Sequence, residues 1–203
     1  AAKQCLRISR EWSVERKQWG SAIGKHEAVA AKLSTMASMV FAMDAMVWLV
    51  SALVDRKSSD IRLEAAMAKL FCSEACWRIV DDTVQIRGGR GYESADSLRA
   101  RGEHPYPVER IMRESRINLI IEGTSEIMRL FIAREALDQH MRVVGDAMDP
   151  RASSSAKAKA LARAAAYYAW WWPARWLGLC LTRSHREFGP LAGHVAFVER
   201  AGH

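Results

Sequence analysis

The sequence has few of the residue patterns that build metal centres or disulfide frameworks. Its four cysteines form no Cys-x-x-Cys pair and have no histidine at metal-ligand spacing. Cys72 and Cys76 stand one helical turn apart, and Cys72 falls on an apolar stripe. We therefore expect core thiols in a reducing compartment and no metal site. The cysteines are Cys5, Cys72, Cys76 and Cys180.

A secretory signal and a long uncharged apolar run are also missing from the sequence. We expect no membrane-spanning segment, and a location in the bacterial cytoplasm or the mitochondrial matrix. The first residue is Ala1, and a helical pattern is already under way at Leu6 and Ile8. This start predicts that the chain is a piece of a longer protein.

Basic residues outnumber acidic ones by 30 to 23, which gives a net charge of +7. This balance suits anionic partners: nucleic acid, an acidic membrane surface, or phosphate-bearing ligands such as dinucleotides and coenzyme A. A nucleic-acid surface needs lysine and arginine clustered on one face, whereas here they alternate with acids, as in residues 109–114. Nucleic acid is therefore the least favoured of these partners.

Helical periodicity dominates the sequence, and no segment has the pattern of a β-strand. Apolar residues recur at steps of three and four from Val29 to Val54 and again from Ile61 to Ile79. Residues 3–19 and 125–142 form two further helices. The inner side of the last is expected to carry Ile127, Leu130, Leu137 and Met141. The prediction is an all-α fold: an antiparallel four-helix bundle over residues 1–145.

Residues 146–203 are expected to form a linker and a C-terminal helical extension. Its aromatic run from Tyr167 to Trp172 lies close to Arg175. We expect these rings to pack against another helical surface, with peripheral contact to a membrane as the alternative.

The region 87–107 holds four glycines and two prolines and predicts a long loop. Gly88 and Gly89 allow the backbone to come close to a ligand. Arg87 and Arg90 are expected to be solvated, with phosphate contacts as the alternative. Pro107 suits the first turn of a short helix.

Glu122 is the predicted catalytic residue. It follows the apolar residues 119–121 and precedes Gly123, just before a helix. A carboxylate kept against apolar surface is poorly solvated and becomes a better base toward a carbon-bound proton. The simpler interpretation of the motif is a helix N-cap at Thr124 or Ser125, with Glu126 at the positive end of the helix dipole.

Four motifs, in order, make residues 1–145 similar to the C-terminal helical domain of acyl-CoA dehydrogenases. This resemblance implies an FAD-dependent enzyme that oxidises an acyl-CoA to the trans-2-enoyl-CoA and passes electrons to an electron-transfer flavoprotein. It also implies a homodimer or homotetramer. The motifs are Arg16-Lys17-Gln18-Trp19-Gly20, His26-Glu27, Gln85 to Tyr92 with Pro107 to Arg110, and Glu122-Gly123-Thr124-Ser125-Glu126.

The resemblance also assigns roles to residues. Glu122 takes the α-proton, its N–H binds the thioester carbonyl, and Gly123 leaves room for the acyl chain and pantetheine. Arg16 reaches the FAD pyrophosphate of a neighbouring subunit. The other residues expected to bind the cofactor are Gln18, His26, Gln85, Ile86, Gly88, Gly89, Thr124 and Glu126.

The chain departs from the family pattern in three places. Glu27 and Glu126 replace glutamines, so they accept hydrogen bonds but cannot donate. The segment 93–106 is longer than the family's usual link, an insertion that surface loops tolerate. The region after residue 150 resembles the extension of the very-long-chain branch, which points to long or bulky acyl groups.

Three alternatives stay open at this point. An acyl-CoA oxidase that uses O2 shares the fold and the base. A DNA-binding relative from the alkylation response would fit the basic charge. The last alternative is a purely structural bundle that has lost catalysis. We expect these 203 residues alone to bind FAD poorly and to be inactive.

Overall fold

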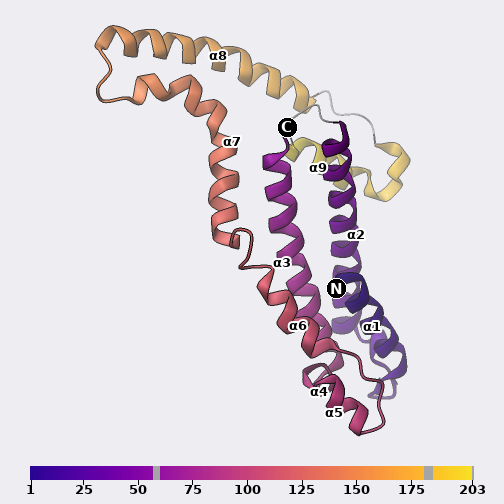
Figure 1. The fold of residues 1–203 in the computed structure, drawn as a ribbon. Coiled ribbons are helices and arrows are strands. Elements are labelled where there is room, and N and C mark those ends of the chain that lie inside the picture. The colour runs from indigo at the N-terminus through magenta and orange to yellow at the C-terminus, as the bar shows by residue number, and fades with distance from the viewer. Residues whose placement is uncertain (57–59, 181–184, 203) are drawn as a thin grey trace. The chain divides into compact units, whose positions relative to one another are not determined.

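The computed structural model describes residues 1–56, 60–180 and 185–202, and helices dominate them (Figure 1). The predicted all-α class is confirmed. The chain divides into two compact units, Ala1–Ala136 and Leu137–His203. The first contains α1 (Ala2–Glu15), α2 (Glu27–Arg56), α3 (Arg62–Arg87), α4 (Gly89–Tyr92), α5 (Ala95–Ala100), α6 (Val108–Ile117) and the start of α7 (Ser125–Met148).

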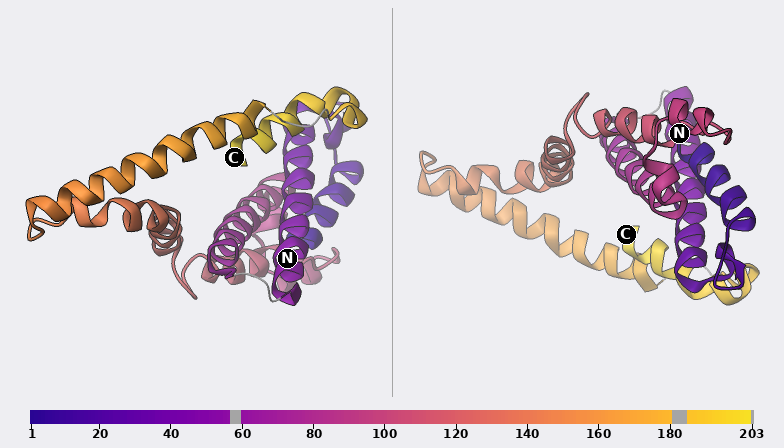
Figure 2. Two further views of the ribbon diagram at one scale, coloured as in Figure 1. Left: turned by 90° about the horizontal axis from the view of Figure 1, so that it is seen from above. Right: turned by 90° about the horizontal axis from the view of Figure 1, so that it is seen from below.

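Helix α3 is the centre of the first unit. It packs against α1, α2 and α6 (Figures 1 and 2), because each of these helices turns apolar side chains toward it. Burying a large apolar side chain contributes about 1.5–3 kcal/mol. The buried core cluster consists of Ala2, Cys5, Met36, Ile79, Val80, Ile86 and Ile111.

The cysteines agree in part with the sequence analysis. Cys5, Cys72 and Cys76 are free thiols, and Cys5 is fully buried. Burial raises the pKa of the Cys5 thiol to about 11, because the thiolate would lose its hydration. Cys72 and Cys76 are half-buried. The side chain of Cys180 lies outside the described residues.

The predicted apolar stripes are buried only in part. On α2, Met36 is fully buried, whereas Val47 and Val54 are exposed. The expectation that α7 turns four apolar residues inward is wrong, since all four are at least half exposed: Ile127, Leu130, Leu137 and Met141. Helix α6, in contrast, does pack on α3.

Among the described helices, α2 alone is long and apolar enough to cross a membrane, judged by length and composition. The sequence analysis expected no such segment. Helix α2 packs against α1 and α3 through Met36 and partly buried neighbours, but none of its most apolar window is buried.

A two-residue β-ribbon corrects the prediction for the end of the first helix. Helix α1 ends at Glu15, and β1 (Lys17–Gln18) pairs antiparallel with β2 (Ser21–Ala22). The turn between them has positive φ at both central residues, 49° at Trp19 and 80° at Gly20. Two positive φ values are the pattern of a type I′ hairpin turn. The expectation of no strand is therefore wrong here.

The region 87–107 is also more ordered than a loop. It contains α4 and α5, and the hydroxyl of Ser94 caps α5 by accepting a hydrogen bond from the Ser97 N–H at 3.3 Å. Leu98 of α5 is fully buried. Gly91 lies so close to α3 that a Cβ there would stand 2.7 Å from the carbonyl oxygen of Val84. Glycine is thus required for this close contact.

The second unit contains the end of α7, α8 (Ser154–Cys180), a 3-10 segment (Arg186–Leu191) and α9 (Ala192–Gly202). Aromatic rings join α7 to α8: the His140 Nδ1 and the Tyr168 hydroxyl are 2.9 Å apart, and Trp171 meets the His140 ring edge-on. Trp170 and Trp172 are exposed. The predicted packing therefore holds for Trp171, while membrane contact stays a prediction. The side chain of Arg175 lies outside the described residues.

Candidate functional site

The β-ribbon gathers three of the predicted cofactor residues at one end of the first unit. The Arg16 guanidinium lies 3.4 Å from the side-chain oxygen of Gln18. The His26 Nε2 is 3.0 Å from the Gln18 carbonyl, and its ring meets Trp19 edge-on at 5.6 Å. Trp19 is 84% exposed. A large exposed ring of this kind is suited to contact a ligand or another protein chain.

Residues at the C-terminal end of α3 lie next to the β-ribbon residues. Gly88 ends the helix at a φ of 61°, where a residue with a Cβ is strained. A Cβ at Gly88 or Gly89 would meet no atom within 4 Å, so the surface above both is open. Five predicted cofactor residues line one hollow here, which we call the ribbon hollow: Arg16, Gln18, Ile86, Gly88 and Gly89, together with Trp12, Ile23, Arg87 and Arg90. Gln85 is exposed nearby.

Thr124 and Glu126 lie elsewhere, in a hollow between α3 and α7 that Arg116, Arg129 and Trp77 also line. The Thr124 hydroxyl accepts a hydrogen bond from the Ile127 N–H at 3.3 Å, so the N-cap interpretation of the motif is confirmed. A hydrogen bond from its own backbone N–H and another from Thr124 hold the pKa of Glu126 below its usual range.

Ser125, between them, is 7% exposed, and its hydroxyl has no hydrogen-bond partner among the described residues. A buried hydroxyl without a partner costs free energy unless something else supplies the bond. Ser125 lines the α3–α7 hollow and is thus a polar residue there whose hydroxyl the described chain leaves unpaired.

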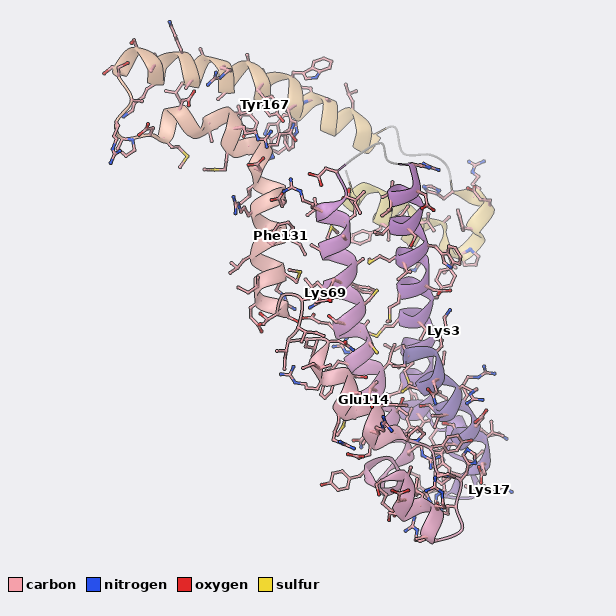
Figure 3. The ribbon with its side chains drawn as sticks, viewed as in Figure 1. Lys3, Lys17, Lys69, Glu114, Phe131 and Tyr167 are labelled. Carbon is pink, nitrogen blue, oxygen red and sulfur yellow. The ribbon has the colours of Figure 1, made fainter. Side chains whose placement is uncertain are left out.

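Glu122 stands at the turn between α6 and α7. Its φ is 53° and that of Gly123 is 94°, so two successive residues have left-handed backbone. The Lys69 ammonium on α3 donates a hydrogen bond to the Gly123 carbonyl, and Figure 3 labels Lys69 on this helix. Glu122 lines a hollow with Lys69 and others from α3: Cys72, Ser73 and Cys76, with Asn118 and Ile121 from the turn.

The predicted apolar shielding of Glu122 is not met within this chain. Its side chain is exposed, and Ile120 and Ile121 are each nearly half exposed. The neighbouring apolar residues in the sequence therefore do not cover the carboxylate.

The predicted residues thus gather at two places along α3, one near the Glu122 turn and one at the ribbon hollow. Lys69, beside the Glu122 turn, and Ile86, in the ribbon hollow, lie about 25 Å apart at 1.5 Å per residue. Lys69 and Lys17, both labelled in Figure 3, mark these two places. One compact ligand cannot touch both.

Sequence reasoning missed the part played by Arg87 and Arg90. Arg87 was expected to be solvated but is only 5% exposed, with its guanidinium 4.7 Å from the Trp12 ring and 4.9 Å from the Tyr106 ring. Burial lowers the pKa of Arg87. A signal was present, because Arg87 continues a four-residue spacing from the buried Ile79 and Thr83. Arg90 is engaged as well, in a two-bond pair with Glu103.

Metal chemistry finds no support in the described part of the chain, where no group of three or more His, Cys, Asp or Glu residues could hold an ion. The two places on α3 are instead made of arginines, hydroxyls, glycines and one strained carboxylate.

Residues 1–137 match the family model described as acyl-CoA dehydrogenase, C-terminal domain. The chain belongs to the acyl-CoA dehydrogenase family. The match covers α1 to α6 and the first half of α7, and so includes both places on α3.

Curated relatives agree with this assignment. The probable acyl-CoA dehydrogenase FadE10 of Mycobacterium tuberculosis is 54% identical over 201 residues, 98% of this chain and 31% of that protein. The bovine mitochondrial very long-chain specific acyl-CoA dehydrogenase is 38% identical over 121 residues, 60% of this chain and 17% of that protein. The chain therefore spans less than a third of the length of these relatives.

A solved member of the acyl-CoA dehydrogenase family has the same fold. The butyryl-CoA dehydrogenase of Megasphaera elsdenii superposes with a TM-score of 0.58 at 29% identity, over 67% of this chain and 33% of that one.

Proposed function

We propose that this chain is part of a flavin-dependent acyl-CoA dehydrogenase, with Glu122 as the base that takes the α-proton of an acyl-CoA thioester. The product is the trans-2-enoyl-CoA. The backbone at Glu122 is the single observation that carries the proposal.

A non-glycine residue in left-handed backbone costs roughly 1–2 kcal/mol. Glu122 adopts it at φ 53°, where a glycine would be free of that cost. Such strain persists only when the surroundings hold it, and it concentrates at functional sites. Here the following Gly123 and the Lys69 hydrogen bond hold the turn. We infer that the strained turn serves to point a carboxylate at a substrate.

The carboxylate needs a drier setting than this chain provides by itself, since Glu122 is exposed. The chain spans 31% of the length of FadE10. We propose that the remainder of the longer protein and the bound acyl chain cover Glu122. Exclusion of water would then make the carboxylate a stronger base.

The residues present fit an FAD. The open backbone at Gly88 and Gly89 leaves room for a large planar group, and Arg16 has planar donors suited to a pyrophosphate. The unpartnered Ser125 hydroxyl, with Thr124, supplies polar atoms at the other place. When bound, FAD supplies the hydride acceptor for the β-hydrogen.

Different residues of the chain serve the substrate and the cofactor. Glu122 removes the α-proton, and its backbone N–H donates to the thioester carbonyl, which stabilises the charge that develops there. Gly123 leaves room for the pantetheine. Because the ribbon hollow lies about 25 Å from the Glu122 turn along α3, we propose that Arg16 serves the FAD of a neighbouring subunit in a homodimer or homotetramer.

We propose an electron-transfer flavoprotein as the electron acceptor and a bacterial cytoplasmic or mitochondrial-matrix location. The competing acceptor is O2, as in an acyl-CoA oxidase. Stopped-flow reoxidation of the reduced protein in air separates the two: slow reoxidation supports the dehydrogenase, and rapid reoxidation contradicts it.

A DNA-binding function has weaker support. On α6 the arginines are engaged with acids on the same helix, Arg110 with Glu114 and Arg113 with Glu109. Paired charges of both signs attract phosphates poorly. A mobility shift that vanishes steeply with salt would favour this function.

The test of the base is Glu122→Gln in the full-length protein. We expect loss of nearly all dehydrogenation, with FAD content and acyl-CoA binding retained, because the amide keeps the shape but cannot accept the proton. Glu114→Gln, an exposed α6 carboxylate labelled in Figure 3, is the matched control and should keep the parent rate. Turnover by Glu122→Gln at the parent rate would contradict the proposal.

A further inference from the structure

Arg87 is a buried cation without a hydrogen-bonding partner. It is 5% exposed, and its Nε has no partner among the described residues. Its described contacts are the faces of Trp12 and Tyr106, at 4.7 and 4.9 Å. Ring faces offset part of the lost hydration. A buried guanidinium still needs acceptors for its N–H groups, and leaving them unpaired is costly.

Two carboxylates, Glu103 and Glu15, lie near Arg87, and both act on it through charge alone. Glu103 accepts two hydrogen bonds from Arg90, at 2.5 and 2.8 Å, and one from Arg101 at 3.2 Å. The Tyr106 hydroxyl donates to Glu11 at 2.8 Å. No carboxylate of the described chain is hydrogen-bonded to Arg87.

Arg87 also forms part of the wall of a second hollow, of about 610 Å³, which we call the arginine hollow. This volume lies in the range of small-molecule sites. Its walls carry four cations and two carboxylates, and Glu103 is one of the two. The lining residues are Trp12, Glu15, Arg16, Lys17, Arg87, Arg90, Gly102, Glu103, His104 and Tyr106.

We propose that the arginine hollow binds a phosphate ester and that Arg87 is its principal ligand, with Arg16 and Arg90 beside it. An anion there supplies the acceptors that Arg87 lacks. The guanidinium is planar and presents several donors to phosphate oxygens at once. The rings of Trp12 and Tyr106 hold the Arg87 guanidinium in place at this site.

The insertion gives this site its outer wall. Gly102, Glu103, His104 and Tyr106 all belong to the segment 87–107 that the sequence predicted as a loop. The Arg90–Glu103 pair holds that wall to α4, the short helix that follows α3. The segment therefore builds a binding surface around Arg87 and does not only connect two helices.

Two kinds of molecule could supply this phosphate group. It is either the diphosphate of the FAD already proposed for the adjoining ribbon hollow, or that of a separate nucleotide. The first source rests on the proposed function and the second does not.

The experiment measures inorganic pyrophosphate binding to the purified full-length protein, freed of FAD, by isothermal titration calorimetry. We expect Arg87→Met to weaken binding at least tenfold. It should also raise the melting temperature of the ligand-free protein, because it removes a buried guanidinium whose Nε has no acceptor, while the apolar methionine side chain keeps the packing. Arg110→Met, which removes an exposed α6 arginine, is the matched control and should change neither quantity.

Unchanged pyrophosphate affinity in Arg87→Met overturns the proposal and leaves Arg87 as a packing residue between two rings. If Arg87→Met does not fold, Arg87→Lys decides the matter: it keeps the charge but loses the planar donors, and we expect several-fold weaker binding. Parent affinity in Arg87→Lys would overturn the proposal in that case.

A second titration identifies the source in the FAD-loaded protein. If FAD abolishes pyrophosphate binding, the phosphate is that of FAD, and Arg87→Met should weaken FAD binding too. If binding persists and still depends on Arg87, the ligand is a separate nucleotide. Neither result depends on Glu122, so loss of catalysis in Glu122→Gln remains an independent test of the proposed function.

Discussion

The ammonium group of Lys69 on α3 donates a hydrogen bond to the backbone carbonyl of Gly123, the residue after Glu122. Fifty-four positions of sequence separate the two partners. The bond ties the strained turn to the central helix of the first unit. A long-range contact of this kind sets the direction of the proposed base more firmly than the local sequence can.

Replacing Lys69 with methionine should slow dehydrogenation. A hydrogen bond from a charged donor contributes roughly 1.5–3 kcal/mol, and loss of that amount from the transition state slows the rate by about tenfold to a hundredfold. We expect kcat to fall while FAD content stays at the parent level. Steady-state kinetics of the full-length variant measures this.

Lys3→Met is the control for this prediction, since Lys3 is an exposed lysine that pairs with Asp44 at 2.7 Å and lies outside the turn. Its kcat should equal that of the parent. An unchanged kcat in Lys69→Met would show that the hydrogen bond does not position Glu122.

Two glycine substitutions should change stability in opposite directions. Gly123 has a φ of 94°, and a Cβ there would lie 2.4 Å from the Met128 methyl group. We expect Gly123→Ala to lower the free energy of unfolding by about 1–2 kcal/mol, mainly through backbone strain, because the flexible Met128 side chain can move aside.

Gly145 lies inside α7, and a Cβ there would meet no atom within 4 Å. Alanine is the better helix former by about 1 kcal/mol, so Gly145→Ala should raise the free energy of unfolding. Urea denaturation of both variants provides the comparison. Equal changes in the two would mean that the turn at Gly123 is not strained.

The Arg90–Glu103 pair should make the insertion sensitive to acid. The hydrogen bond from Arg90 holds the pKa of Glu103 below its usual range. A depressed pKa in the folded state means that the pair adds stability above the ordinary glutamate pKa. This stability is lost as the pH falls through the folded-state value.

Hydrogen exchange of α5 measures this effect. We expect the amides of α5 to exchange faster, after correction for the intrinsic rate, as the pH falls below the ordinary glutamate range. Glu103→Gln should show the faster exchange already at neutral pH and little further change with acid. A parent-like profile for Glu103→Gln would mean that Leu98 alone anchors the segment.

The spacing of apolar residues was sufficient to predict a helix wherever one helix face packs on the core. The spacing through Met36 and Ile79 predicted two long helices, and both residues are fully buried. Pattern failed for Ile127 and Leu130, which are exposed although their spacing is the same. Periodicity identifies an apolar face, but it does not say which surface covers that face.

The candidate site shows the same division. The motifs located Arg16, Gly88 and Glu122 along the chain, yet their sequence order could not show that α3 separates the ribbon hollow from the Glu122 turn. Lys69 was overlooked and the burial of Arg87 was not predicted, because both depend on partners far away in sequence, Gly123 and Tyr106.

By itself, the sequence determined the helical class, the family motifs and the identity of the proposed base, because each follows from residue type and short-range spacing. Tertiary structure alone decided that Glu122 lies on a strained turn held by Lys69, and that Arg87 is buried against two rings with no hydrogen-bond acceptor for its Nε. The physical reason is that burial, hydrogen-bond partners and backbone strain depend on contacts between segments distant in sequence, which no local pattern encodes.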